Sequence, residues 1–183
     1  WSRLSGLHAL NRPERVIVVG AAGRLLPPLP PGATAIVDPA ALAGRGPLSG
    51  VVVGLGAVEE PRVLVVTVDA LALSVDLLRA LDALDAGDGV APLRDGRLQP
   101  FPCLVPREKA LVLARAMLAA EERRASTWIE RVAPRAVTTD LLLASSAALR
   151  RLDPALLALE DADDPEAAAR LLAALPGSRR SGP

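Results

Sequence analysis

The apolar positions of this chain follow two alternating patterns. Short runs of mostly β-branched residues at 15–19, 34–38 and 62–69 are typical of buried strands. The segment 46–58 predicts a helix, and Ser74 is a good N-cap for another whose leucines share one face. Strands without polar alternation, separated by helices, predict an α/β fold. We expect a three-layer sandwich with a mainly parallel, Rossmann-like sheet and helices on both faces.

The second half of the chain carries a different pattern. Apolar stretches at 89–93 and 99–105 flank the turn-forming residues 94–97 and predict a hairpin-like excursion. The remaining predicted elements are a long helix from Pro106 to Ala120, a helix at 127–132, a short apolar segment at 136–138, and a terminal helix starting near Asp163-Asp-Pro-Glu166. We expect one domain over residues 1–175, followed by a disordered tail at 176–183.

Composition narrows the class of protein. Twenty-one basic residues balance twenty-one acidic ones, so no net field draws the chain to nucleic acid or to an anionic membrane surface. The apolar runs are too short for a membrane-spanning helix, and we recognise no secretory leader. With one cysteine, Cys103, and one histidine, His8, the chain has no internal disulfide, and a Cys/His zinc cluster is excluded. We expect a cytoplasmic protein with a small-molecule ligand.

Two aspartates end predicted strands, Asp38 and Asp69. Ligands of open parallel sheets bind outside the carboxyl ends of the strands, so both are candidates for a nucleotide site. A carboxylate in the position of Asp69 commonly holds Mg²⁺ bound to substrate phosphates, although capping of the next turn is an equal alternative from pattern alone. For Asp38, which precedes Pro39, a turn-forming role is favoured on the same grounds.

A glycine-rich segment, 44–50, leads into the helix predicted from Gly46. Its backbone N–H groups suit a phosphate or a base. The segment is neither a Walker A loop nor a dinucleotide fingerprint. Residues 19–23 do follow a strand with glycines, but the proline-rich residues 25–32 cannot continue as the helix that a dinucleotide site needs.

The order of these motifs resembles the molybdenum cofactor guanylyltransferases over most of Arg15 to Leu172. The matching segments are Glu14-Arg-Val-Ile-Val-Val-Gly20, Ile36-Val-Asp38, Gly46-Pro-Leu-Ser-Gly50, Val63-Leu-Val-Val-Thr-Val-Asp69, Asp95-Gly-Arg-Leu-Gln-Pro100, Glu122-Arg-Arg-Ala-Ser-Thr-Trp-Ile129 and Asp163-Asp-Pro-Glu166. Each motif is moderately specific, and their common order is the stronger signal.

The resemblance implies a three-layer α/β nucleotidyltransferase that joins GMP from Mg-GTP to molybdopterin and releases pyrophosphate. Its partners would be GTP, the molybdopterin cofactor, and molybdoenzymes or other cofactor-biosynthesis proteins. By this resemblance Asp38 and the segment beginning Gly46-Pro47 contact the guanine nucleotide; the family segment reads Gly-Pro-Leu-Ala-Gly. Asp69 would be the catalytic residue that binds Mg²⁺ and GTP. Gln99, Pro100, Arg123 and Arg124 would lie on the cofactor side.

The family also has a first strand and a phosphate-binding loop, Leu-Ala-Gly-Gly-x-Ser-x-Arg-Met-Gly-x-Asp-Lys, ahead of these motifs. Residues 1–183 contain no match to that loop, and the only lysine, Lys109, lies in the long helix of the second half. We therefore expect this chain alone to transfer no guanylyl group. Two alternatives follow: a catalytically inactive, degenerate homologue that binds a nucleotide or pterin, and a transferase acting on another acceptor, such as a phospholactate or a sugar phosphate.

Other notable residues have simpler interpretations. The run 121–124 is expected to be a solvated helix end with local ion pairs. Trp128 and Phe101 are expected in core or interdomain packing, since the chain has too few aromatic residues for a base-stacking platform. Cys103 is expected to be a buried small apolar residue rather than a nucleophile.

Overall fold

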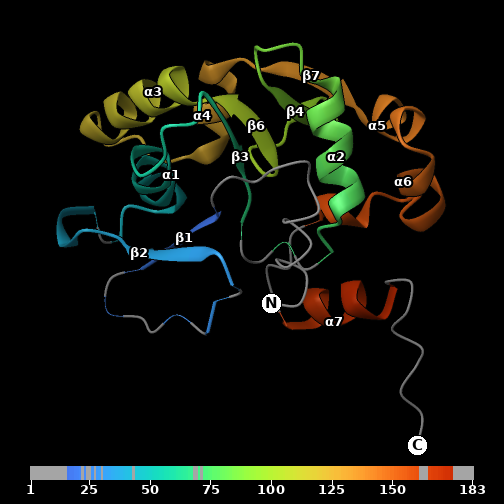
Figure 1. The fold of residues 1–183 in the computed structure, drawn as a ribbon, viewed down its shortest axis with the longest axis horizontal. Helices are drawn as coiled ribbons and strands as arrows, with labels where there is room; N and C mark the ends of the chain where they lie inside the picture. The colour runs from blue at the N-terminus through green and yellow to red at the C-terminus, as the bar shows by residue number, and fades with distance from the viewer. Residues whose placement is uncertain are drawn as a thin grey trace, which may run out of the picture.

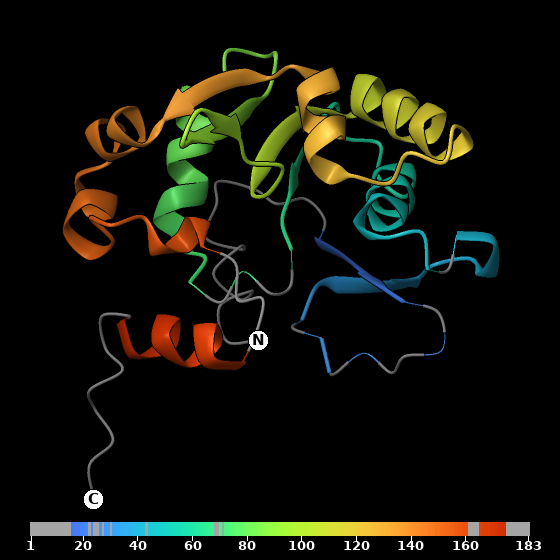
Figure 2. The same ribbon diagram turned by 180° about the vertical axis from the view of Figure 1, so that it is seen from behind.

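The computed structural model describes residues 16–21, 23, 26, 28–29, 31–42, 44–67, 70, 72–160 and 165–174. Within these ranges a central mixed sheet lies between two groups of helices, which gives the expected three layers (Figure 1). The strands are β3 (Arg62–Val65), β4 (Val90–Arg94), β5 (Arg97–Leu98), β6 (Cys103–Pro106) and β7 (Arg135–Thr138). Figure 2 shows the same arrangement from behind.

The strand directions correct the expectation of a mainly parallel sheet. In the described part of the chain, β3 pairs with β6, and β6 and β5 pair with successive parts of one edge of β4. β7 pairs with the opposite edge of β4. β3, β4 and β7 run in one direction, but β6 lies between β3 and β4 and is antiparallel to both, and β5 is antiparallel to β4. The hairpin predicted in the second half is the cause, because its return strand inserts between two parallel strands.

Residues that alternate along the strands face opposite helical layers. Ala91, Cys103 and Val105 face α1 (Pro47–Gly56), α3 (Arg107–Ala119) and α4 (Ala125–Val132). Val90 and Val137 face α2 (Val75–Leu84) and the helices that follow β7. Side chains of a strand alternate between faces, so a sheet with an apolar run on every central strand must be covered twice. The expectation of helices on both faces is confirmed.

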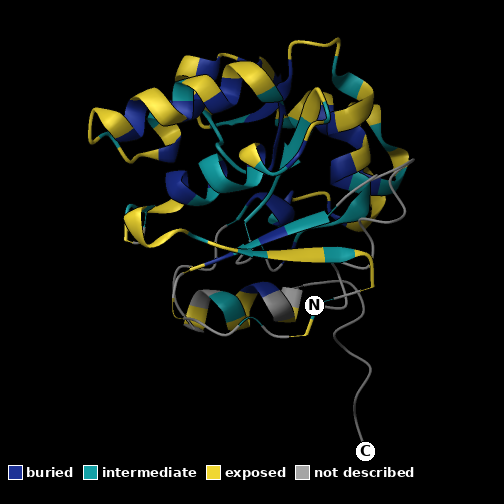
Figure 3. Cartoon of the chain, turned by 60° about the vertical axis from the view of Figure 1, so that its left-hand side comes forward, coloured by how far each residue is buried: buried dark blue, intermediate teal, exposed yellow. Residues whose placement is uncertain are grey.

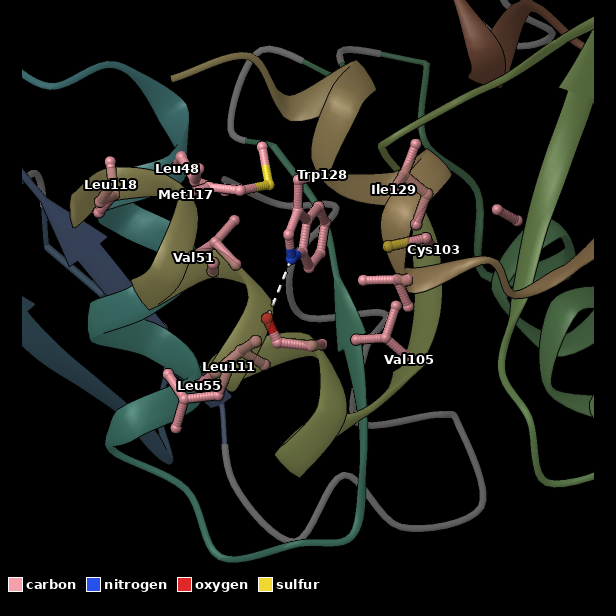
Figure 4. Close-up of a cluster of buried hydrophobic side chains, with 14 residues drawn as sticks. Leu48, Val51, Leu55, Cys103, Val105, Leu111, Met117, Leu118, Trp128 and Ile129 are labelled. Carbon is pink, nitrogen blue, oxygen red and sulfur yellow. Dashed lines mark hydrogen bonds between the residues drawn. The ribbon is translucent and has the colours of Figure 1, made fainter. Parts of the chain in front are cut away.

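Trp128 lies at the centre of the α1, α3 and α4 layer. Its side chain is fully buried, and its indole Nε1 donates a hydrogen bond to the carbonyl of Ala110, 3.0 Å away. Figure 4 shows the ring between Met117 of α3 and the Cys103 side of the sheet. Burial raises the pKa of the Cys103 thiol. Both Trp128 and Cys103 therefore have the core roles that the sequence predicted.

A second, two-stranded parallel sheet of described residues joins β1 (Val16–Gly20) to β2 (Ala33–Val37). The β1 side rests on α1, where a Cβ at Gly54 would lie 3.4 Å from Val19. β2 is largely exposed, as Figure 3 shows, and Val37 retains 52% of its accessible surface. The amide of Asp38 donates to the carbonyl of Gly20, so Asp38 stands immediately beyond the paired carboxyl end of β2.

The C-terminal region contains elements that the sequence patterns did not predict. They are α5 (Thr139–Ser145), α6 (Ala147–Leu152) and the 3₁₀ turn η3 (Leu157–Leu159); a second 3₁₀ turn, η2 (Ala40–Leu42), follows Asp38. The side chains of Thr138 and Ser146 cap α5 and α6, and the buried Asp153 accepts from the amides of residues 157 and 158. The predicted terminal helix is α7 (Pro165–Ala174), with proline at its start.

Two further features of the described chain bear on the expectations above. No helix in these ranges has the length and apolar character needed to cross a membrane. The tail expected to be disordered, 176–183, lies outside the described residues, and the one-domain assignment stays a prediction.

Candidate functional site

Asp38 and Ser49 form the first contact of the candidate site. Asp38 follows β2, and Ser49 is the third residue of α1, where it is 3% exposed. The Ser49 hydroxyl lies 3.2 Å from Oδ2 of Asp38 and 2.7 Å from the carbonyl oxygen of Gly46. The other carboxylate oxygen of Asp38, Oδ1, is buried and has no hydrogen-bond partner among the described residues. A buried carboxylate oxygen without a donor is costly, which marks Asp38 for a ligand.

The N-terminus of α1 adjoins this carboxylate. Gly46 is the N-cap, with φ of 76°, and Pro47 is the first helical residue. No side chain caps the helix, because glycine has none to offer. The first N–H groups of a helix carry partial positive charge and favour a negative group nearby. The structure therefore brings the predicted residues Asp38, Gly46 and Pro47 together at one helix end.

Arg123 lies beside the same helix end. A Cβ placed on Gly46 would lie 3.8 Å from the Arg123 carbonyl oxygen and 3.9 Å from its Cβ. The exposed Arg123 guanidinium makes no hydrogen bond or ion pair with any described residue. We refer to Asp38, Gly46, Pro47, Ser49 and Arg123 as the α1 N-terminal cluster. It joins residues predicted for the nucleotide side to one predicted for the cofactor side.

Arg124 differs from its neighbour because it is paired. Its guanidinium donates to both carboxylate oxygens of Glu122, at 3.0 and 2.8 Å. Glu122 also accepts from the backbone amides of Arg123 and Arg124. The hydrogen bond from the Arg124 side chain is the main cause that lowers the pKa of Glu122 to about 2. The expected local ion pair at 121–124 is confirmed, and it leaves Arg123 as the arginine open to a ligand.

Gln99 and Pro100 lie in a detour between β5 and β6. Leu98 pairs with Leu93 and Leu104 with Val90, so the chain advances six residues where β4 advances three. The residues of the detour therefore bulge out of the sheet, a feature common beside active sites. The Gln99 amide still donates to the carbonyl of Pro92, 2.8 Å away, and its side chain donates to that of Arg97.

Helix α4 connects the detour to the α1 N-terminal cluster. Phe101, which follows Pro100, packs on Trp128 of α4 with ring centroids 6.2 Å apart. Arg124 is the N-cap of the same helix, and α4 packs against both α1 and β5. Elements of both groups of predicted residues thus pack against α4, and no described hydrogen bond or ion pair links Gln99 to the cluster.

Asp69 lies outside the described residues, so its predicted role as a metal ligand stays a prediction. The register pairs Val65, near the carboxyl end of β3, with Cys103, the first residue of β6. Asp69 follows this strand in sequence, and Gln99 and Pro100 precede β6. Among the described residues there is no group of three or more acidic, histidine or cysteine side chains that could hold a metal.

Ser49 was not singled out by the sequence patterns. It stands inside the glycine-rich segment, and its hydroxyl contacts the candidate nucleotide aspartate. The available signal was a hydroxyl residue at the fourth position of a predicted helix, eleven residues after a strand-ending aspartate.

A comparison with protein families identifies the family of the chain. A family model described as a MobA-like NTP transferase domain matches residues 4–137, which is more than half of the chain. The chain belongs to this family. Among curated proteins, none matches the chain. Membership in the MobA-like family makes the protein a nucleotidyltransferase with a nucleotide substrate, and such transferases typically use a divalent metal. The match ends at β7, so α5, α6 and α7 lie beyond it.

Proposed function

We propose that this protein is a molybdenum cofactor guanylyltransferase. In the proposed reaction, a terminal phosphate oxygen of molybdopterin attacks the α-phosphorus of GTP. The new phosphorus–oxygen bond forms as the bond between the α- and β-phosphates breaks, and pyrophosphate leaves. The MobA-like match and the order of the sequence motifs support this assignment.

The assignment of guanine as the base rests on Oδ1 of Asp38, which has no hydrogen-bond partner among the described residues. An ionised carboxylate only accepts hydrogen bonds. Guanine offers two adjacent donors to a carboxylate, at N1 and at its exocyclic 2-amino group, whereas adenine offers only its exocyclic 6-amino group, beside an N1 that accepts. Asp38 has one oxygen near Ser49 and one oxygen buried without a donor in the described chain. A guanine edge would supply that donor, so the pairing favours GTP over ATP.

The remaining roles follow the same proposal. Asp69 would hold Mg²⁺. This ion is usually bound in proteins through one or two carboxylates together with substrate phosphates. A magnesium site of this kind does not need a larger acidic cluster, and none is present among the described residues. Bound Mg²⁺ would neutralise charge on the phosphates. Arg123 would attract the anionic acceptor at the α1 end, with Gln99 and Pro100 contacting its pterin part and Arg124 ordering the segment. Molybdopterin and molybdoenzymes are the proposed partners, in the cytoplasm.

A calorimetric titration with GTP and ATP, each with and without Mg²⁺, tests this proposal. We expect selective, Mg²⁺-dependent binding of GTP. Asp38→Asn gives a sharper test, because an amide adds a donor where the carboxylate only accepts. The Asn variant should lose affinity for GTP by about tenfold or more and gain relative affinity for XTP, whose base has a carbonyl in place of the 2-amino group.

Each result has a distinct meaning. Equal binding of GTP and ATP by the unmodified chain would remove the guanine assignment and leave the nucleotidyltransferase family intact. Residues 1–183 alone are expected to transfer no guanylyl group, so selective GTP binding without transfer is the expected result, and measurable transfer to molybdopterin would show that the phosphate site has been misplaced. Selective binding that Asp38→Asn leaves unchanged would show that the base is recognised elsewhere.

A further inference from the structure

Ser49 has two acceptors and a single proton. Its hydroxyl lies 2.7 Å from the Gly46 carbonyl oxygen and 3.2 Å from Oδ2 of Asp38, and both neighbours accept. A serine hydroxyl donates one hydrogen bond at a time. Ser49 is 3% exposed and Oδ1 of Asp38 is itself buried, so bulk water does not have ready access to donate to that oxygen. The single hydroxyl proton can therefore be donated either to the Gly46 carbonyl, within the first turn of α1, or to the Asp38 carboxylate.

The two positions of the proton have different consequences for Asp38. With the proton on the Gly46 side, the carboxylate receives no donor from Ser49, and both of its oxygens need one. With the proton on the Asp38 side, Oδ2 gains a charge-assisted hydrogen bond and Oδ1 stays without a partner in the described chain. In both cases Oδ1 remains an open acceptor, and the second case also fixes the orientation of the carboxylate.

We propose that Ser49 is a positioning residue that orients Asp38 for recognition of the nucleotide base. The hydroxyl holds Oδ2, so Oδ1 is presented to the donor edge of the base. This inference rests on the proposed function and adds a specificity-determining residue to it.

Ser49→Ala is the direct test. Alanine is a better helix former than serine, so α1 is expected to remain folded. We expect the affinity for GTP to fall by about five- to tenfold while the affinity for ATP stays the same, because only the base that uses the oriented carboxylate loses the interaction. Ser49→Thr keeps the hydroxyl and should restore most of the preference for GTP.

Ser145 provides a matched control. Its hydroxyl donates to the carbonyl of Leu142, three residues earlier in α5, at 2.8 Å, which is the same local geometry as the bond from Ser49 to Gly46. No carboxylate bond to Ser145 is present in the described chain. Ser145→Ala should therefore leave the ratio of GTP to ATP affinity unchanged.

A double-mutant cycle separates positioning from a merely structural role. If Ser49 acts through Asp38, Ser49→Ala should cause no further loss of GTP affinity in an Asp38→Asn background. Additive losses, or equal losses for GTP and ATP together with a lower melting temperature, would overturn the proposal and leave Ser49 as a helix residue. A Ser49→Ala variant that binds GTP as the unmodified chain does would also overturn it, with the guanine assignment intact. If the unmodified chain shows no preference for GTP, that assignment fails first, and the Ser49 proposal fails with it.

Discussion

Gly46 and Arg123, which are 77 residues apart in sequence, meet at the first turn of α1: a Cβ on Gly46 would lie 3.9 Å from the Cβ of Arg123. Ser49 links Gly46 to Asp38, so this contact brings the residues just before α4 next to the end of β2. The distance is an ordinary van der Waals contact, so space alone does not require glycine. The backbone does, because Gly46 has φ of 76°.

Two glycine substitutions in the same segment should therefore have opposite effects. Gly46→Ala forces a side chain into a positive-φ, extended backbone conformation that essentially only glycine adopts, and should destabilise the fold by about 1–3 kcal/mol. Gly50→Ala lies in the interior of α1, where no described atom lies within 4 Å of the added Cβ, and should stabilise it by about 0.5–1 kcal/mol. Chemical denaturation of both variants measures the difference. Equal effects would show that φ at Gly46 does not limit stability.

Trp128→Phe tests the core beneath the candidate site. The change removes the hydrogen bond to the Ala110 carbonyl and leaves part of a ring volume empty, so we expect a loss of about 2 kcal/mol. Urea denaturation monitored by circular dichroism measures it. Val112→Ala on the outer face of α3, where the side chain is 60% exposed, should change stability by less than about 0.5 kcal/mol. A comparable loss in both variants would argue against this description of the core.

Asp85 should contribute stability that depends on pH. Burial raises its pKa, but hydrogen bonds from the Gly87 amide, Arg62 and the Gly89 amide together outweigh burial, so the pKa lies below its ordinary value of 3.8. A depressed folded-state pKa stabilises the protein above the ordinary value, and this stability is lost as pH falls through the folded-state pKa. Asp85→Asn should cost about 1–2 kcal/mol at pH 7.

The difference between Asp85→Asn and the unmodified chain should shrink as the pH is lowered from about 4 through the folded-state pKa. Thermal melts of both proteins across pH 2–7 measure this dependence, because that range includes pH values at which the Asp85 carboxyl is ionised and values at which it becomes protonated. Asp88→Asn, in the same turn but exposed, is the matched control and should show a much smaller effect. A constant difference across the range would contradict the assignment to ionised Asp85.

The two arginines before α4 should respond unequally to substitution. Arg123→Ala should weaken binding of the anionic acceptor by about three- to fivefold, because its guanidinium is exposed and forms no described ion pair. Arg124→Ala should have a smaller effect, since Glu122 already pairs with that charge. Glu122→Gln, which releases Arg124, should strengthen binding. Titration with molybdopterin at low salt tests the order, and equal losses from both arginine variants would contradict it.

Much of the fold could be predicted because its signals are local. Ser74 caps α2 as its sequence context indicates, and the turn at Asp95 and Gly96 joins β4 to β5 as a two-residue hairpin with positive φ at both positions. The position of β6 between β3 and β4 is not a local property. It depends on which strand edges the hairpin covers, so the sequence pattern led to the wrong balance of parallel and antiparallel pairs.

The residues of the candidate site likewise fall into those that local sequence patterns predict and those that they do not. Asp38 and Gly46 could be selected from strand ends and a glycine-rich turn. The difference between Arg123 and Arg124 could not, because it depends on which guanidinium Glu122 holds. The contact between Ser49 and Asp38 depends on how closely β2 and α1 approach, and no residue pattern carries that distance. The short helices α5 and α6 were missed because their caps, Thr138 and Ser146, follow each other too closely for a clear helical period.

The detour between β5 and β6 can change in length without disturbing the sheet. Pairing of Leu98 with Leu93 and of Leu104 with Val90 holds the sheet in register on either side of it. Residues can therefore be inserted or deleted within the detour while every strand keeps its neighbours and its buried face. If Gln99 and Pro100 contact the acceptor as proposed, changes of length in this detour would alter acceptor binding without altering the pairing of the strands.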